Sequence, residues 1–337
     1  MGKEIMTNIS KSILTRRHFL KCSAYGGTSL LFGIHCPKAS GSSLTSLKRI
    51  KMPRLAVEFN NHAACFYLAK AKGWFEEEGM ELTYFESHQT GWGVAAALAR
   101  EDIKGAYLCL APLLLIYNLG VPIKILTSTH LHGYGIVVNP KIQHPDELNG
   151  KTIGCMREGL PPDLLFHRMK EKFGLKEITL KRMEPSKQVM ALISGSIDGA
   201  CLPEHYVSIA ESKGFPVLIK SQDIWPGMPG SVLAVRSNWF KSDDIEIFRR
   251  LYKLTQRGTQ ALNDKRRKKE NAEAIGKILE IPAQVASQSM GRLEYRNDLE
   301  AGAVQEMIDY MADLGYLKKG LRAEDLLIDP SNLRGIQ

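Results

Sequence analysis

The strongest constraint on the fold is an alternation of short apolar segments with segments of helical periodicity. This alternation is typical of α/β sheets whose parallel strands are joined by crossover helices. The predicted strands are 54–59, 80–85, 105–110, 123–127, 152–156, 178–183, 199–202 and 216–219. Helices are predicted between them, and the region from Asp243 onward is predicted to be almost wholly helical.

A short internal echo indicates that two parts of the chain share one architecture. Residues 97–108 align with residues 191–202, with six of the twelve positions identical. Each copy has the pattern of a helix end, a tight turn and a buried strand that begins with Gly-Ala. The echo therefore predicts a repeated βαβ unit in two lobes.

The first residues have the pattern of a bacterial export signal. A twin-arginine sequence at residues 15–21 precedes a modestly apolar stretch, residues 22–34, and then a run of small residues near Gly41. Cys22 and Cys36 lack the preceding small residue expected at a lipid-attachment site. The sequence therefore predicts a twin-arginine signal over residues 1–41, cleaved near Gly41, and a soluble periplasmic protein.

Charge and cysteine content exclude several classes. The formal net charge is +9, but residues 1–41 hold six Lys/Arg and one Glu, and without them it drops to +4, too little to indicate nucleic acid binding. Four cysteines follow the predicted cleavage position: Cys65, Cys109, Cys155 and Cys201. They form no Cys-x-x-Cys pair, so no metal and no cofactor is expected. Buried thiols are favoured over a disulfide, although the sequence leaves their redox state open.

Three motifs carry a family resemblance. The chain has GWFEEEGMEL at residues 73–82, a Gly-Ala strand leading to Ala111-Pro112, and DELNGKTIG at residues 146–154. Together they resemble the solute-binding proteins of nitrate, sulfonate and taurine ABC importers. That group is similar in turn to binding proteins and enzymes for thiamine pyrimidine precursors.

The resemblance implies an α/β, two-lobed periplasmic binding protein (type II-like) with two mixed sheets flanked by helices. Lobe one would comprise residues 52–135 plus 232–337, with the C-terminal helices packed on it, and lobe two residues 136–231. The crossovers would lie near residues 135–139 and 231–236. The lobes would close on a small solute, and the partners would be an ABC permease and its ATPase. A monomer is expected.

The candidate ligand-binding residues follow predicted strands, because ligands of open α/β sheets bind outside the carboxyl ends of the strands. In lobe one they are Asn60, Asn61, His62, Thr90, Gly91, Trp92, Ala111 and His132. Amides and imidazoles can donate and accept hydrogen bonds, and Trp92 can stack on a flat ligand. Capping by Asn61 and core packing by Trp92 are the structural alternatives.

In lobe two the candidates are Arg157, Glu158, Gly159, Glu204 and His205. Arg157 offers a charged fork for a carboxylate, sulfonate or phosphate, and the start of the helix that follows is expected to add free amides. Glu204 suits a ligand with an amine or a ring N–H and argues against simple nitrate. The mixture favours a small zwitterionic or heteroaromatic solute.

Three function classes compete. The first is a receptor that closes on a solute and delivers it to a permease. The second is an enzyme similar to the thiamine-pyrimidine synthases, but their clustered cysteines are missing and no catalytic constellation is visible, so no enzyme is predicted. The third is a periplasmic sensory receptor, which the sequence does not separate from a transport receptor.

Overall fold

The protein is described by a computed structural model that covers residues 50–82, 84–239 and 245–328. The predicted export signal and its cleavage position near Gly41 lie outside these residues. The described residues belong to one compact unit, residues 47–337. No helix among them is both long and apolar enough to cross a membrane.

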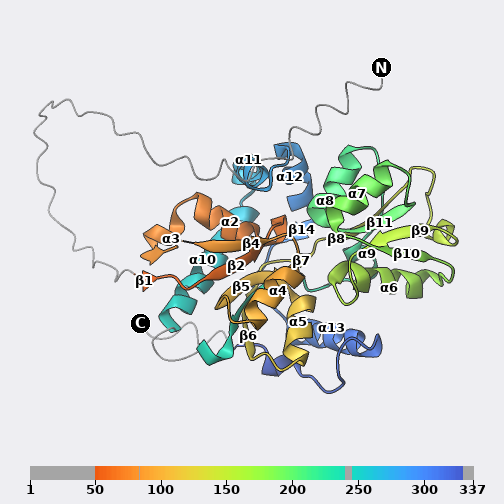
Figure 1. Cartoon of the computed structure of the whole chain (residues 1–337). Coiled ribbons are helices and arrows are strands. Elements are labelled where there is room, and N and C mark those ends of the chain that lie inside the picture. The colour runs from red at the N-terminus through yellow and green to blue at the C-terminus, as the bar shows by residue number, and fades with distance from the viewer. Residues whose placement is uncertain (1–49, 83, 240–244, 329–337) are drawn as a thin grey trace, which may run out of the picture. The chain divides into compact units, whose positions relative to one another are not determined.

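Two five-stranded sheets organise the described chain (Figure 1). The first has the order β4-β2-β5-β13-β6, with strands Phe85–His88, Leu55–Glu58, Gly105–Cys109, Ser231–Arg236 and Ile123–Ser128. The second has the order β10-β9-β11-β8-β12, with strands Thr179–Arg182, Thr152–Cys155, Gly199–Pro203, Tyr134–Val138 and Val217–Lys220. We call the first sheet, with the helices that connect its strands, the first half. The second sheet and its connecting helices are the second half.

The two sheets correspond strand for strand. In each, the first three strands are parallel and the fourth, β13 or β8, is antiparallel to both of its neighbours. The echoed segments end in β5 and β11, which hold the third place in their sheets. Their Gly-Ala starts allow close packing: a Cβ on Gly105 would lie 3.0 Å from Leu55 Cδ2, and one on Gly199 2.8 Å from Ile153 Cδ1. Both sheets are mixed, as predicted.

Helices connect the strands of each sheet, and further helices follow β13 in the chain. In the first half they are α2 (Ala64–Ala71), α3 (Trp74–Glu77), α4 (Gly91–Ala99) and α5 (Leu110–Asn118). In the second half they are α6 (Pro161–Phe173), α7 (Pro185–Ile193), α8 (Glu204–Ser212) and α9 (Ser221–Ile224). The C-terminal helices are α10 (Ile245–Asn263), α11 (Lys268–Leu279), α12 (Ala283–Met290) and α13 (Ala301–Asp313).

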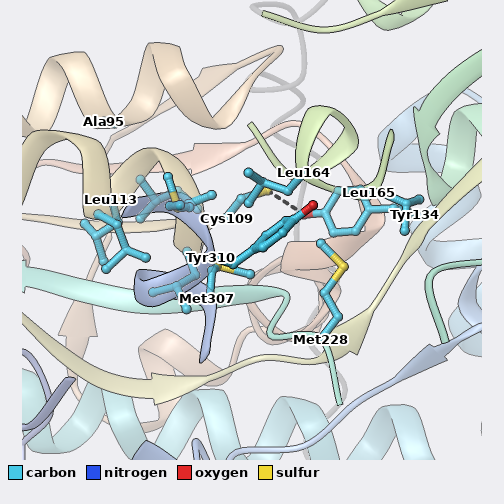
Figure 2. Packing of buried hydrophobic residues seen from close by; sticks show 14 of the residues in the cluster. Ala95, Cys109, Leu113, Tyr134, Leu164, Leu165, Met228, Met307 and Tyr310 are labelled. Carbon is cyan, nitrogen blue, oxygen red and sulfur yellow. Dashed lines mark hydrogen bonds between the residues drawn. The ribbon is translucent and has the colours of Figure 1, made fainter. Parts of the chain in front are cut away.

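The C-terminal helices contact both halves. α10 packs on α2 through an apolar cluster that contains Phe66 and Phe248, and α12 packs against α8 of the second half (Figure 1). A second cluster joins Leu113 of α5, Leu164 of α6 and Met307 of α13 (Figure 2). Because burial of apolar area is the main stabilising term, this shared core holds the two halves together.

Several predicted boundaries were wrong. The strand expected at 80–85 is two strands, β3 (Met80–Glu81), which pairs with β1 (Ile50–Lys51), and β4. α4 and α8 begin earlier than expected, so Trp92 and Glu204 lie in first helical turns. The segments near which the crossovers were expected form the strands β8 and β13, and each of these strands begins directly after the chain passes from one sheet to the other. The chain passes between the sheets at residues 132–134 and 220–231.

Candidate functional site

Buried polar side chains from both halves meet between the two sheets. We call this group the seam, and its members are Glu58, Asn61, His62, Cys109, Tyr134, Glu204, His205 and Arg292. Arg292 is 16% exposed and the other side chains are buried. Most follow the carboxyl ends of strands, the place where α/β sheets bind ligands.

His62 lies at the middle of the seam. Its Nε2 donates to the Gly133 carbonyl oxygen at 2.9 Å, and its ring centroid is 4.4 Å from that of His130 and 5.0 Å from that of Tyr134. Burial, and the nearby His205, lower the pKa of His62 to about 3, and burial lowers the pKa of His205 to about 3. The seam therefore presents neutral imidazoles at pH 7.

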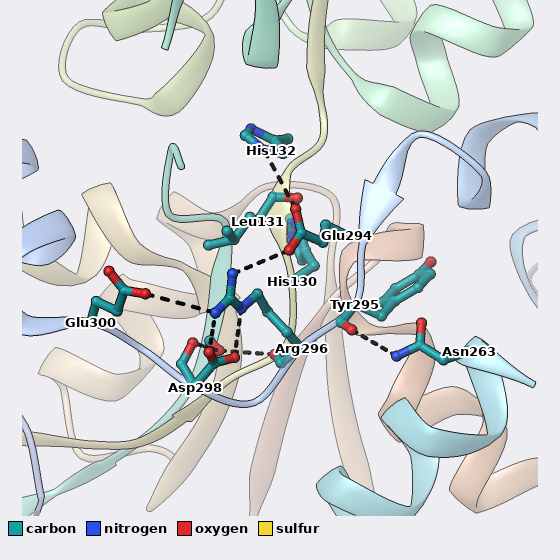
Figure 3. A network of polar contacts seen from close by, with 10 residues as sticks. His130, Leu131, His132, Asn263, Glu294, Tyr295, Arg296, Asp298 and Glu300 are labelled. Carbon is teal, nitrogen blue, oxygen red and sulfur yellow. Dashed lines mark hydrogen bonds and ion pairs between the residues drawn. The ribbon is translucent and has the colours of Figure 1, made fainter. Parts of the chain in front are cut away.

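The turn from β7 (Leu131–His132) to β8 is conformationally constrained. His132 and Gly133 have φ values of 63° and 90°, in the left-handed region. A Cβ on Gly133 would lie 2.4 Å from Leu293 Cδ2 and 2.8 Å from His62 Nε2. Pairing of β7 with β14 (Leu293–Glu294) brings His132 Nε2 to 3.9 Å from a Glu294 carboxylate oxygen (Figure 3). Only glycine fits at position 133 without displacing these neighbours.

Cys109 joins the two halves through hydrogen bonds. The Tyr134 hydroxyl of β8 donates to Cys109 Sγ at 3.0 Å (Figure 2), and the thiol donates to Glu58 Oε2 at 2.9 Å. His62 Nδ1 is 4.0 Å from the same sulfur. Burial raises the pKa of the Cys109 thiol well above its usual range, so the thiol is a hydrogen-bonding group and not an activated nucleophile.

Glu58, the last residue of β2, is surrounded by donors. Its Oε2 accepts from the Cys109 backbone N–H at 3.2 Å and from the Cys109 thiol at 2.9 Å, and the nearby Gly91 backbone and Asn60 side chain also favour the ionised carboxylate. Burial raises the pKa of Glu58, and these hydrogen bonds counteract part of that rise. None of the ion pairs of residues 50–82, 84–239 and 245–328 includes Glu58.

Glu204 has its own counter-ion. Arg292 Nη1 lies 3.1 Å from Glu204 Oε1, and the Ser208 hydroxyl donates to the same oxygen at 3.1 Å. Arg292 also pairs with Glu211 of α8. Burial raises the pKa of Glu204 to about 7, against the opposing effect of Arg292. Arg292 thus ties the C-terminal segment to the second half.

Some buried polar atoms have no hydrogen-bond partner among the residues that the structure describes. Both amide atoms of Asn61, Nδ1 of His132 and Nδ1 of His205 are buried and form no hydrogen bond. Leaving such a group unpaired costs about 1–3 kcal/mol. A polar ligand that paired these atoms would remove this cost.

Arg157 lies away from this buried group. It is exposed, and its guanidinium carbon lies 3.9 Å from the centroid of the Trp92 ring of α4. Trp92, itself half-buried, thus stacks on Arg157 of the other half. This contact, like the Arg292 pair, links segments that lie far apart in the sequence.

The expectation of free amides at the start of α6 was wrong. Pro161 and Pro162 carry no N–H, and the Gly159 N–H donates to Asp163 Oδ2 at 3.0 Å. Asp163 is fully buried, and Arg182 Nη1 lies 2.6 Å from its Oδ1. The neighbouring Glu158 is exposed and lies 3.8 Å from Arg182.

The remaining candidates have local roles. Asn60, rather than Asn61, caps the short helix η1 (Asn61–Ala63) by accepting from the His62 N–H at 3.0 Å. Thr90 caps α4 by accepting from the Gly93 N–H at 3.4 Å. Gly91 lies against Glu58, and Ala111 is buried in α5.

Sequence reasoning missed Glu58, Cys109, Tyr134 and Arg292. One signal was available for Glu58, because an acid at the end of an otherwise apolar strand is unusual. No local pattern marks Arg292, whose partner Glu204 is 88 residues away. In the part of the chain that the structure describes, no group of three or more His, Cys, Asp or Glu side chains is placed to hold a metal ion.

Comparison with known proteins gives sequence relatives. A Bacillus subtilis protein named for aliphatic sulfonate binding is 24% identical over 302 residues, which cover 87% of this chain and 88% of that protein. The nitrate import ATP-binding protein NrtC of Synechocystis is 25% identical over 197 residues, 51% of this chain. The chain spans only 29% of that ATP-binding protein's length.

The fold matches a solved structure. The periplasmic aliphatic sulphonate binding protein SsuA from Escherichia coli superposes with a TM-score of 0.69 at 17% identity, over 84% of this chain and 94% of that one. This likeness confirms the predicted fold class. The family model described as "NMT1-like family" matches residues 54–279, more than half of the chain. The chain therefore belongs to the NMT1-like family.

Proposed function

We propose that the protein is the periplasmic solute receptor of an ABC importer. It captures a small polar solute at the seam and presents it to a permease, whose ATPase drives import. The relatives named above are binding proteins and an importer ATPase, which favours a receptor over an enzyme of the thiamine-pyrimidine synthase type. Ligands considered from the sequence are sulfonates, taurine, nitrate-like anions and pyrimidine precursors.

The unpartnered amide of Asn61 carries the proposal. A fully buried amide with two unpaired atoms is costly, and a solute bound between the halves would pair them. Solute contacts from both halves would stabilise the closed arrangement. Export by the twin-arginine route, with the signal removed near Gly41, and a monomeric state belong to the same proposal.

Asn61→Ala tests the receptor function. Because the Asn61 side chain makes no hydrogen bond to the described residues and its burial unpaired is costly, the variant should fold with a melting temperature close to or above that of the parent. Solute affinity should fall about 10- to 100-fold, since two hydrogen bonds to the solute are lost. Native mass spectrometry of the mature protein, purified without refolding, identifies the retained solute, and calorimetry measures its affinity.

Asn149→Ala, at an exposed position outside the seam, is the control and should bind as the parent does. Absence of any retained molecule, with no thermal shift across sulfonates, nitrate, amino acids and pyrimidines, would contradict the receptor function. Equal affinity of the parent and Asn61→Ala would remove Asn61 from the site.

A further inference from the structure

In the first half, a carboxyl group of the protein lies against the N-termini of two helices. α4 and α5 begin beside the carboxyl end of β2, where Glu58 lies. The Cys109 N–H at the N-cap of α5 donates to Glu58 Oε2 at 3.2 Å, and Gly91, the first residue of α4, lies against the same carboxyl group. Helix N-termini attract anions through these free N–H groups and through the helix dipole.

Three of the other positions at these helix starts have a donor that is already paired or lack an N–H. The Leu110 N–H donates to the Gly230 carbonyl at 3.0 Å, and Pro112 has no N–H. The Gly93 N–H is taken by Thr90. A Cβ on Gly91 would lie 2.9 Å from Glu58 Oε2, so the carboxyl group fills this space tightly. An oxyanion from solution would have to displace Glu58 to reach the same donors.

In the second half, carboxyl groups of the protein also lie at the N-termini of two helices. Asp163 and Glu204 lie in the first turns of α6 and α8, and both are buried. Each pairs with an arginine, Arg182 or Arg292, whereas Glu58 accepts hydrogen bonds and has no ion pair among the described residues. The helix starts around the seam therefore carry carboxyl groups where an anion-binding protein would leave free amides.

We propose that Glu58 determines ligand class: its carboxyl group occupies the oxyanion position of the first half, so the solute is an uncharged or cationic polar molecule and not a sulfonate or nitrate. That the protein binds a solute rests on the proposed receptor function. That the Glu58 carboxyl group occupies the oxyanion position does not depend on that function. The unpartnered Asn61 amide and His205 Nδ1 are uncharged groups that suit such a solute.

Thermal-shift measurements with small anions test directly whether Glu58 occupies the oxyanion position. Nitrate and methanesulfonate should not raise the melting temperature of the wild-type protein. Glu58→Ala opens a carboxylate-sized space beside the same donors, and acetate should fill it. At ten times the dissociation constant of acetate, the melting temperature of this variant should rise by about 2 °C.

Two variants control for volume and for general salt effects. Glu58→Gln keeps the site filled and should not respond to acetate, and Glu86→Ala removes a carboxylate on the neighbouring strand β4 and should not respond either.

A rise of the wild-type melting temperature with nitrate or methanesulfonate would overturn the proposal even if Glu58→Ala does not fold. A folded Glu58→Ala that ignores acetate would overturn it as well. Failure of the receptor function would instead show as no retained solute in native mass spectrometry, with the acetate result unchanged.

Discussion

The turn from β5 to α5 and the turn from β11 to α8 occupy equivalent places in the two halves, yet they satisfy a buried carboxyl group differently. At α8 the carboxyl belongs to Glu204, the first residue of the helix, and Arg292 neutralises it. At α5 it belongs to Glu58 of the neighbouring strand, and Cys109 supplies hydrogen bonds from its N–H and its thiol. The same backbone arrangement therefore supports either an ion pair or a chain of hydrogen bonds without a counter-ion.

The difference follows from what packs against each turn. α12 packs against α8, and the chain after α12 brings Arg292 to the α8 start. Beside α5, the contacts come from Tyr134 and His62, whose groups are uncharged at neutral pH. Burying a charge without a counter-ion is costly, so the environment of Glu58 raises its pKa.

The largest effect should come from removing the counter-ion at α8. Arg292→Met leaves Glu204 buried without its cation and should lower the free energy of unfolding by about 3 kcal/mol. Urea denaturation at pH 8 measures the loss. Arg100→Met breaks an exposed pair with Asp102 and should change stability by less than about 1 kcal/mol. Equal losses in the two variants would mean that the α8 ion pair does not stabilise the fold.

The pH dependence of stability should also distinguish the two turns. The pKa of Glu204 is raised from its ordinary value of 4.5 to about 7, so between these values the folded state binds more protons than the unfolded state. Its contribution is therefore present at low pH and is lost as the pH rises through about 7. The stability of the wild type relative to Glu204→Gln should fall by about 2 kcal/mol from pH 5 to pH 7.

Subtracting the stability profile of Glu204→Gln from that of the wild type removes the contributions of the buried imidazoles. These contributions change with pH in the direction opposite to that of Glu204. Lowered pKa values of His62 and His205, about 3 each, make the protein lose stability as the pH falls below 6.5. A flat difference profile between pH 5 and 7 would show that Glu204 titrates normally.

The smallest effects compare single hydrogen bonds at the two turns. Ser208→Ala removes a donor to the Glu204 carboxylate and should cost about 1.5 kcal/mol, because hydrogen bonds to charged groups are the stronger ones. Tyr134→Phe removes a donor to the Cys109 thiol and should cost about 0.5 kcal/mol. Chemical denaturation at pH 8 resolves this order, and a reversed order would indicate that the hydrogen-bond chain at Cys109 is the more stabilising of the two.

Much of the local architecture could be predicted from the sequence. Strands β2, β5 and β11 lie where apolar periodicity places them, and the echo between residues 97–108 and 191–202 marks the third strand of each sheet. Such patterns depend on neighbours in the chain, so one sequence suffices to find them. Boundaries were less accurate, since caps such as Thr90 extend helices beyond their apolar residues.

The sequence by itself determined the element order, the repeated βαβ unit and the resemblance that led to the family. Tertiary structure decided which side chains share the seam: Cys109, expected as an inert buried thiol, joins Tyr134 to Glu58, and Arg157, expected to bind an anion, stacks on Trp92. The physical reason is the distance along the chain over which each kind of interaction acts. Periodicity reports local burial, whereas ion pairs and hydrogen bonds between residues far apart depend on how the sheets pack, which no local pattern encodes.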